Sequence, residues 1–320
     1  MNHRLFRKPM AVAIALVWVL AGCQHPEKSV SPLPSPQPSV SPLSSPLDKP
    51  TSPWPAGRLL YHSNETGVYQ IYLVDDGQPP VAMTGAPGSA TEPAWSPDGR
   101  EIAFSAYTTD VNNVRVYTMP IAGDEKREVT SVQPRLNWRP DWSPDGTELL
   151  FQSNRDNNFE IYKVSIGADP PVNLTNHPSN DGDPDWSPDG STIVFISDRN
   201  GSNGLYTMAA DGSAVVELLD ESWSCTSPRW SPDGRQIAFA SKRDGTADIY
   251  VMNADGGDVR PVTDRPGDNV MPAWVGTDRL VFSGEVGDLS WDLFLINLDG
   301  SGLVRLTDTP ESERFPAWAP

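Results

Sequence analysis

Residues 184–190 read Pro-Asp-Trp-Ser-Pro-Asp-Gly, and closely similar stretches recur along the chain. Four copies of Pro-x-Trp continue into Ser-Pro-Asp-Gly, where proline sets φ for a type I turn and glycine accepts the left-handed angle that closes a hairpin. The six tryptophans of Pro-x-Trp lie 47, 44, 44, 44 and 44 residues apart, at Trp95, Trp142, Trp186, Trp230, Trp274 and Trp318. A fixed period of this length predicts propeller blades or solenoid units.

The segments between these turns favour a propeller over a solenoid. Each turn precedes a short apolar run such as 149–151 (Leu-Leu-Phe), and then come a pair such as Ile161-Tyr162, a turn and a fourth short run such as 172–175. No helical period interrupts this order. Four short strands joined by hairpins form one blade, so the sequence predicts an all-β fold, a six-bladed β-propeller of four-stranded antiparallel blades over residues 58–320. We read the repeated tryptophans as core residues wedged between blades.

The two ends of the repeat region predict how the ring closes. The first unit, residues 58–85, has no Pro-x-Trp before it, whereas the last Pro-x-Trp ends at Trp318 with no strands after it. We therefore expect the C-terminal strand around 315–318 to complete the first blade. Such a shared blade leaves the ring without an open sheet edge.

The N-terminal segment has the layout of an export signal. Arg4, Arg7 and Lys8 precede an apolar run over 10–22 that is too short to span a bilayer. The run ends in Leu20-Ala21-Gly22-Cys23, which resembles the lipobox of bacterial lipoproteins and implies a signal peptide over 1–22 and lipidation of Cys23. An ordinary secreted protein with a chance cysteine is the alternative. The chain has two cysteines, so a disulfide between distant Cys23 and Cys225 is not expected. Cys225 is read as an unreactive thiol at a strand start.

A flexible linker is predicted between this anchor and the propeller, over residues 23–57. Its 33 positions from 24 to 56 contain ten Pro and eight Ser, a composition that can build neither a hydrogen-bonded ladder nor a core. Cleavage before Cys23 would take the formal net charge from −18 to −21. Because such a surface repels phosphate backbones, we expect no nucleic-acid partner.

The repeat resembles a known family. Trp-Ser-Pro-Asp-Gly, then Ile-Ala-Phe, then Ser-x-Arg-Asp as at 153–156 and 241–244, then Ile-Tyr and Leu-Thr, is similar to the TolB-type propeller repeat over residues 58–320. The resemblance implies the propeller fold and leaves the function open, since the repeat occurs in a periplasmic protein that contacts an outer-membrane lipoprotein, in gating domains of peptidases and in some polysaccharide lyases. Those periplasmic relatives carry a small α/β domain where this chain has a lipobox and a proline-rich linker.

Catalytic motifs are missing from the sequence. The chain has no Gly-x-Ser-x-Gly elbow, no His-Glu-x-x-His and no glycine-rich phosphate loop. His62 and His177 fall in different units, which is weak material for a metal centre. Loop oxygens at 156–158, 198–201 and 244–245 lack the calcium-loop spacing, and we interpret them as turn residues, with a calcium site as the alternative. We expect no enzymatic activity, no catalytic residue, no metal and no cofactor.

A partner-binding face is predicted from the tryptophans outside the repeat. Loops after the second and fourth strands of each blade emerge at one end of the ring, and Trp138, Trp223 and Trp291 map to these loops. Aromatic residues of this kind are candidate contact anchors, or else they cover loop edges as local packing. The same end carries a candidate channel mouth, formed by the variable residues before each Pro-x-Trp: Glu92, Asn137, Arg139, Asp181, Asp183, Thr226, Ser227, Asn269, Glu313 and Arg314.

These observations lead to a functional prediction. We expect a non-catalytic, membrane-anchored envelope lipoprotein, monomeric in its propeller, that binds a protein or peptide partner. The alternative is a glycan- or metal-binding propeller, with or without lyase-type activity, which would use the narrow channel instead of the broad aromatic face. Gln24 after Cys23 resembles the pattern sorted to an outer membrane. The expected location is the periplasmic side of that membrane in a cell with two membranes, and otherwise the outer face of the cell membrane.

Overall fold

The computed structural model describes residues 54–85, 88–107, 113–123, 125–130, 135–167, 170–287 and 290–319. The predicted signal peptide, Cys23 and most of the linker lie outside these ranges. Twenty-four strands and one short 3-10 helix, η1 (Glu221–Trp223), make up the named elements of this part of the chain. It contains no helix with the length and apolar character needed to cross a bilayer.

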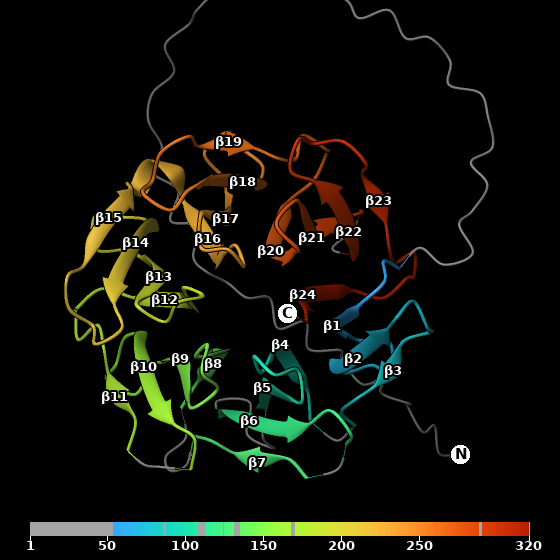
Figure 1. Cartoon of the computed structure of the whole chain (residues 1–320), viewed down its shortest axis with the longest axis horizontal. Helices are drawn as coiled ribbons and strands as arrows, with labels where there is room; N and C mark the ends of the chain where they lie inside the picture. The colour runs from blue at the N-terminus through green and yellow to red at the C-terminus, as the bar shows by residue number, and fades with distance from the viewer. Residues whose placement is uncertain are drawn as a thin grey trace, which may run out of the picture. The chain divides into compact units, whose positions relative to one another are not determined.

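The strands form six four-stranded sheets arranged as a ring (Figure 1). Within each blade the strands follow one another from the axis outward, and we number the blades along the chain. Blade 1 is β24 (Glu313–Trp318), β1 (Arg58–Ser63), β2 (Gln70–Asp75), β3 (Val81–Ala82); blade 2 is β4 (Ala90–Trp95), β5 (Glu101–Tyr107), β6 (Val114–Pro120), β7 (Arg127–Glu128); blade 3 is β8 (Asn137–Trp142), β9 (Glu148–Ser153), β10 (Glu160–Ser165), β11 (Val172–Asn173). Blade 4 is β12 (Asp181–Trp186), β13 (Thr192–Ser197), β14 (Gly204–Ala209), β15 (Val216–Leu219); blade 5 is β16 (Cys225–Trp230), β17 (Gln236–Ser241), β18 (Asp248–Asn253), β19 (Arg260–Pro261); blade 6 is β20 (Asn269–Val275), β21 (Arg279–Glu285), β22 (Trp291–Asn297), β23 (Val304–Arg305).

The ring closes as predicted, through a blade that both ends of the described chain share. The C-terminal strand β24 pairs antiparallel with β1, with Leu59 opposite Trp318 and Ser63 opposite Glu313 (Figure 1). The Ser63 hydroxyl donates a 2.9 Å hydrogen bond to Glu313 Oε1, and the Ala319 N–H donates to the Arg58 carbonyl at 2.8 Å. The prediction of a six-bladed, four-stranded propeller closed by its last strand is therefore confirmed.

The same aromatic pair holds the core of every blade. Tyr61 or a phenylalanine on the second strand stands opposite an aromatic residue on the third, as Phe151 stands opposite Tyr162. The paired rings lie 5.6 to 5.9 Å apart, centroid to centroid, in all six blades. Aromatic cross-strand pairs add packing beyond the area they bury, so each blade gains the same stabilising contact from one repeated residue pair.

The Ser-Pro-Asp-Gly segments form the expected tight turns. In the turn of blade 4 the Gly190 N–H donates to the Ser187 carbonyl at 2.8 Å, and Gly190 has φ of 72°. Antiparallel pairing puts these turns, together with the turns between third and fourth strands, at one end of the ring, which we call the turn face. Loops between second and third strands, and those leading into each inner strand, lie at the other end, which we call the loop face.

Candidate functional site

A bulge in every inner strand shapes the axis of the ring. The pairing of inner and second strands shifts register next to the proline of each Pro-x-Trp. The residue before each proline has φ between 50° and 58°, a left-handed conformation that is unfavourable for residues with a side chain. We call these six residues the axial ring: Glu92, Arg139, Asp183, Ser227, Met271 and Phe315.

Arg139 joins four blades within the axial ring. Its Nε lies 2.9 Å from Asp183 Oδ1 and 3.4 Å from Glu92 Oε1, and its guanidinium lies 4.3 Å from the centroid of the Phe315 ring. The Arg139 side chain is 10% exposed, and those of Glu92 and Asp183 are 7% exposed. The Glu92 carboxylate also accepts the Arg139 N–H at 2.9 Å, and Asp183 accepts the Ser227 N–H at 2.8 Å. A buried charge network of this kind costs much to break by removing one member.

A cavity of about 870 Å³ lies on the turn side of the axial ring. Repeated Trp and Pro residues form much of its wall, with Glu92 and Arg139 among the other lining groups. The middle residue of Pro-x-Trp makes the lining uneven, since three blades supply alanine and three supply Asp141, Asp185 and Arg229. Its volume falls within the range of small-molecule binding pockets.

Two of the carboxylates that line the cavity, Asp141 and Asp185, interact electrostatically with Arg229. Asp141 accepts the Trp186 N–H at 2.8 Å, Asp185 accepts the Trp230 N–H at 2.7 Å, and Arg229 Nε lies 3.7 Å from Asp185 Oδ1. Burial raises the pKa of Asp141 to about 6. Burial and the charge of Asp141 together raise the pKa of Asp185 well above its ordinary value. The cavity therefore holds a proton-binding carboxyl pair that our reading of the sequence missed.

The three propeller tryptophans outside Pro-x-Trp are partly exposed at the loop face, and they come from different blades. Trp138 stacks on Phe159 with centroids 5.8 Å apart. Trp223 meets the Tyr250 ring edge-on at 5.6 Å, and Trp291 lies under the Arg314 guanidinium at 4.4 Å. Each indole is thus held in place by a neighbouring side chain, and no contact joins one of the three to another within the described residues.

Four of the predicted mouth residues are buried at the start of their inner strands, where they bind a neighbouring arginine or serine. Asn137 accepts from Arg155 at 3.1 Å, Asp181 from Arg199 at 3.0 Å, Asn269 from Arg265 at 2.8 Å, and Glu313 from Ser63 at 2.9 Å. Burial raises the pKa of Asp181 and Glu313. Thr226 and Arg314 are partly exposed. The mouth residues thus divide into an internally bonded set and a smaller accessible set.

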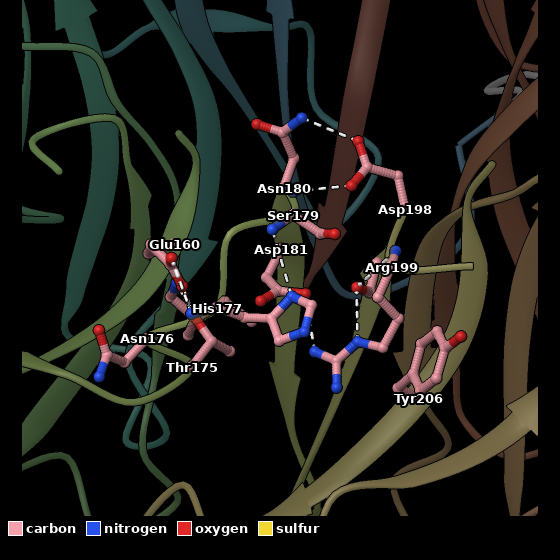
Figure 2. A network of polar contacts seen from close by, with 12 residues as sticks. Glu160, Thr175, Asn176, His177, Ser179, Asn180, Asp181, Asp198, Arg199 and Tyr206 are labelled. Carbon is pink, nitrogen blue, oxygen red and sulfur yellow. Dashed lines mark hydrogen bonds and ion pairs between the residues drawn. The ribbon is translucent and has the colours of Figure 1, made fainter. Parts of the chain in front are cut away.

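The junction of blades 3 and 4 shows how loop carboxylates are used (Figure 2). Both Asp198 oxygens accept hydrogen bonds from Asn180, at 2.7 and 2.8 Å, and His177 Nδ1 accepts the Ser179 N–H at 3.2 Å. In other loops Tyr162 donates to Asp156, and Tyr250 donates to Asp244 at 2.7 Å. These oxygens support the loops of their own blades.

A cluster that could bind a metal ion is absent from the described ranges, and their one cysteine is buried. No three His, Cys, Asp or Glu side chains there come together in a way that could hold a metal ion. Cys225 is buried, and burial raises the pKa of its thiol. A buried, protonated thiol is a poor nucleophile.

Six closed four-stranded blades around a bulged, ion-paired axis define a six-bladed β-propeller. A model of the TolB beta propeller domain matches residues 56–221, just over half of the 320 residues. The chain therefore belongs to the TolB beta propeller domain family.

Comparison with solved structures agrees with this assignment. The crystal structure of TolB from Acinetobacter baumannii is 25% identical with a TM-score of 0.72, over 82% of this chain and 67% of that chain. A putative TolB from Agrobacterium tumefaciens is 22% identical with a TM-score of 0.65, over 82% and 98%. An oligogalacturonate lyase from Vibrio parahaemolyticus shares the fold at 20% identity and a TM-score of 0.56, over 79% and 75%. No curated protein matches the sequence.

The sequence found only part of the axial ring. The predicted channel mouth includes Glu92, Arg139, Asp183 and Ser227 but not Met271 and Phe315, which occupy the same repeat position. Aligning the six repeats by their prolines would have found both. The same alignment exposes the middle position of Pro-x-Trp, where charged residues and alanines divide the blades.

Proposed function

We propose that the protein is a non-catalytic envelope lipoprotein, anchored through Cys23, whose monomeric propeller binds a protein or peptide partner at its loop face. Membership of the TolB beta propeller domain family supports an interaction role. The lipid anchor, the linker over 23–57 and the envelope location rest on the sequence, because these residues lie outside the described ranges. Replacing Cys23 by Ala should abolish incorporation of labelled palmitate. Equal palmitate incorporation by the parent and by that variant would contradict the anchor.

The observation that carries the partner proposal is the state of Trp138, Trp223 and Trp291. All three are partly exposed, and each is held by an aromatic ring or a guanidinium, so little side-chain entropy remains to be lost on binding. Tryptophan and arginine are the residues most enriched among binding hot spots. The loop face therefore has rigid aromatic anchors distributed over several blades, as a broad protein contact requires.

A crosslinking pull-down from native envelopes tests this proposal. The parent chain is compared with a triple variant in which Trp138, Trp223 and Trp291 are replaced by Ala. We expect a stoichiometric partner with the parent and at least a tenfold loss with the triple variant. A matched control replaces exposed Val81, Val172 and Val304 on the outer strands by Ala and should retain the partner. Equal recovery by both variants would contradict the loop-face proposal.

The cavity on the turn side supports a second candidate function, the binding of a glycan or a metal ion. Its volume suits a small ligand, and Asp141 and Asp185 offer carboxylate oxygens. Calorimetric titration of the full chain with Mn²⁺ and with galacturonate oligomers tests this candidate. Saturable heat that disappears when both aspartates are replaced by Asn would support it, and the absence of heat in the parent would exclude these ligands.

A further inference from the structure

Arg314 differs from the other arginines of the molecule. Among the arginines in the described ranges, Arg314 alone makes neither an ion pair nor a hydrogen bond, and its Nε is buried without a partner. The residue is the second of β24, at the loop end of the axis, and is partly exposed. Its chain carries a formal net charge of −18, so acids to pair with are abundant elsewhere. An arginine that has no acidic partner in so acidic a chain indicates that its anion is supplied by another molecule.

The surroundings of Arg314 supply aromatic packing but no carboxylate that forms an ion pair with it among the described residues. Its guanidinium lies 4.4 Å from the Trp291 ring centroid and 5.9 Å from that of Phe315. The nearby carboxylate of Glu92 already lies 3.4 Å from Arg139 Nε and accepts the Arg139 N–H. Stacking on a ring face leaves the edge of a guanidinium, with its forked N–H groups, open to a planar acceptor.

His62 provides an independent sign of an incomplete site. Its side chain is 3% exposed, and neither ring nitrogen has a hydrogen-bond partner. The imidazole packs between Tyr69 and Phe315, with centroids 4.6 and 4.9 Å away, and Phe315 is also the ring on which Arg139 lies. Arg139 Nη1 is likewise buried without a partner. Buried polar groups are nearly always bonded, so several unbonded nitrogens around one phenylalanine point to an acceptor that arrives from outside.

We propose that Arg314, stacked on Trp291 and backed by His62, binds a carboxylate of the protein partner, either an acidic side chain or a chain terminus. The inference rests on the proposed function, since Trp291 belongs to the partner-binding loop face. A planar carboxylate matches the guanidinium fork, and the surrounding rings suit an apolar neighbour beside it. A polyanion such as an acidic polysaccharide fits less well, because a chain of net charge −18 repels a long run of negative charge.

A small-molecule titration tests the site without the partner. The probe is 3-phenylpropionate, followed by NMR of the histidine side chains, of which the full chain has four. We expect saturable shifts of His62 and no response to the neutral 3-phenylpropionamide. Arg314→Gln should weaken binding at least tenfold. Arg243→Gln is the matched control, because the Arg243 guanidinium also stacks on a loop-face tryptophan, 4.2 Å from the Trp223 ring centroid. This variant should leave binding unchanged.

Several outcomes would overturn the proposal. These are no saturable shift in the parent, equal binding by the amide, equal binding by Arg314→Gln, or tighter binding of inorganic phosphate or galacturonate oligomers than of phenylpropionate. Arg314→Lys, which keeps the charge and loses the fork, should bind with intermediate affinity, and it replaces the glutamine variant if that variant fails to fold. Partner capture separates the two proposals. If Arg314→Gln captures the partner fully while the triple tryptophan variant does not, the loop face stands and the carboxylate anchor falls.

Discussion

The two ends of the propeller axis are built differently from the same repeat. On the turn side, residues that recur in most blades, Trp and Pro, wall a cavity of about 870 Å³. At the loop end, residues that occur in one blade each, such as Trp291 and Arg314, form the accessible surface. Repeated residues thus set the geometry of the ring, whereas the residues that differ between blades supply its polar and aromatic groups. Between the two ends lies the axial ring, where both kinds meet.

The largest expected effect comes from opening the ring. Deleting residues 312–320 removes β24, which supplies the inner strand of blade 1 and the bonds from Glu313 and Ala319 to β1. The turn side and the loop end of the propeller should unfold together. Without β24, blade 1 has an exposed sheet edge and the neighbouring blades lose a strand against which they pack. We expect loss of the cooperative thermal transition, measured by circular dichroism. A truncated protein with an unchanged midpoint would rule out the shared blade as the closure.

The next largest effect on stability is expected from replacing Arg139, which links four blades in the axial ring between the turn side and the loop end. Arg139→Met keeps the apolar stem but leaves Glu92 and Asp183 as buried, unpaired carboxylates. Unfolding in urea should show a loss of about 3 to 5 kcal/mol. Arg235→Met, at an arginine whose side chain is 85% exposed, should change stability by less than about 0.5 kcal/mol. Adding Glu92→Gln and Asp183→Asn to Arg139→Met should restore part of the loss, and a failure to do so would show that packing, not charge, is the cause.

The smallest effect is a pH dependence that belongs to the cavity end. Because burial raises the folded-state pKa of Asp141 to about 6 and raises that of Asp185 as well, the native protein holds protons there that the unfolded chain releases. Stability should therefore fall as pH rises from about 4 through about 6, by about 3 kcal/mol for Asp141 alone. The double variant Asp141→Asn, Asp185→Asn should show a smaller fall across that window. Urea unfolding at pH 4, 5, 6 and 7 measures both slopes, and parallel slopes would contradict the assignment.

The turn aspartates should give the opposite pH dependence of stability in the same urea unfolding experiment. Hydrogen bonds from Ser96 and Ser143 lower the pKa of exposed Asp98 and Asp145. Their contribution to stability is present above the unfolded-state pKa and is lost as the pH falls through the lowered folded-state values. Replacing Asp98 by Asn should consequently lower stability at pH values above the unfolded-state pKa, and this loss should shrink in acid, below the window in which the cavity pair titrates.

The fold could be predicted from the sequence because Pro-x-Trp occurs six times at a nearly constant spacing. Each Pro-x-Trp fixes an inner strand, and the unmatched ends of the first and last units specify the closure. The site could be predicted only in part. Whether Glu92 or Phe315 reaches the axis depends on a left-handed residue before proline, a conformation that residue preferences argue against. The partners of Arg139 lie 44 or more residues away, so its pairing emerges only when blades pack side by side.

The absence of a partner for Arg314 was equally out of reach, because a sequence shows which charges exist but not which remain unpaired. Trp291 was selected for lying outside the repeat, and Arg314 for preceding Pro-x-Trp. That the two stack on each other follows from the closure of blade 1 against blade 6, which brings β24 and β22 together in space.

Site-specific photocrosslinking in native envelopes tests whether the partner binds at the loop face. A photoreactive amino acid replaces Thr226 at the loop face in one protein and Asp145 at the turn face in another. We expect the Thr226 position to crosslink one defined protein and the Asp145 position to crosslink none. Crosslinking of a defined protein from Asp145 alone would contradict loop-face binding and would move the partner site to the opposite end of the propeller.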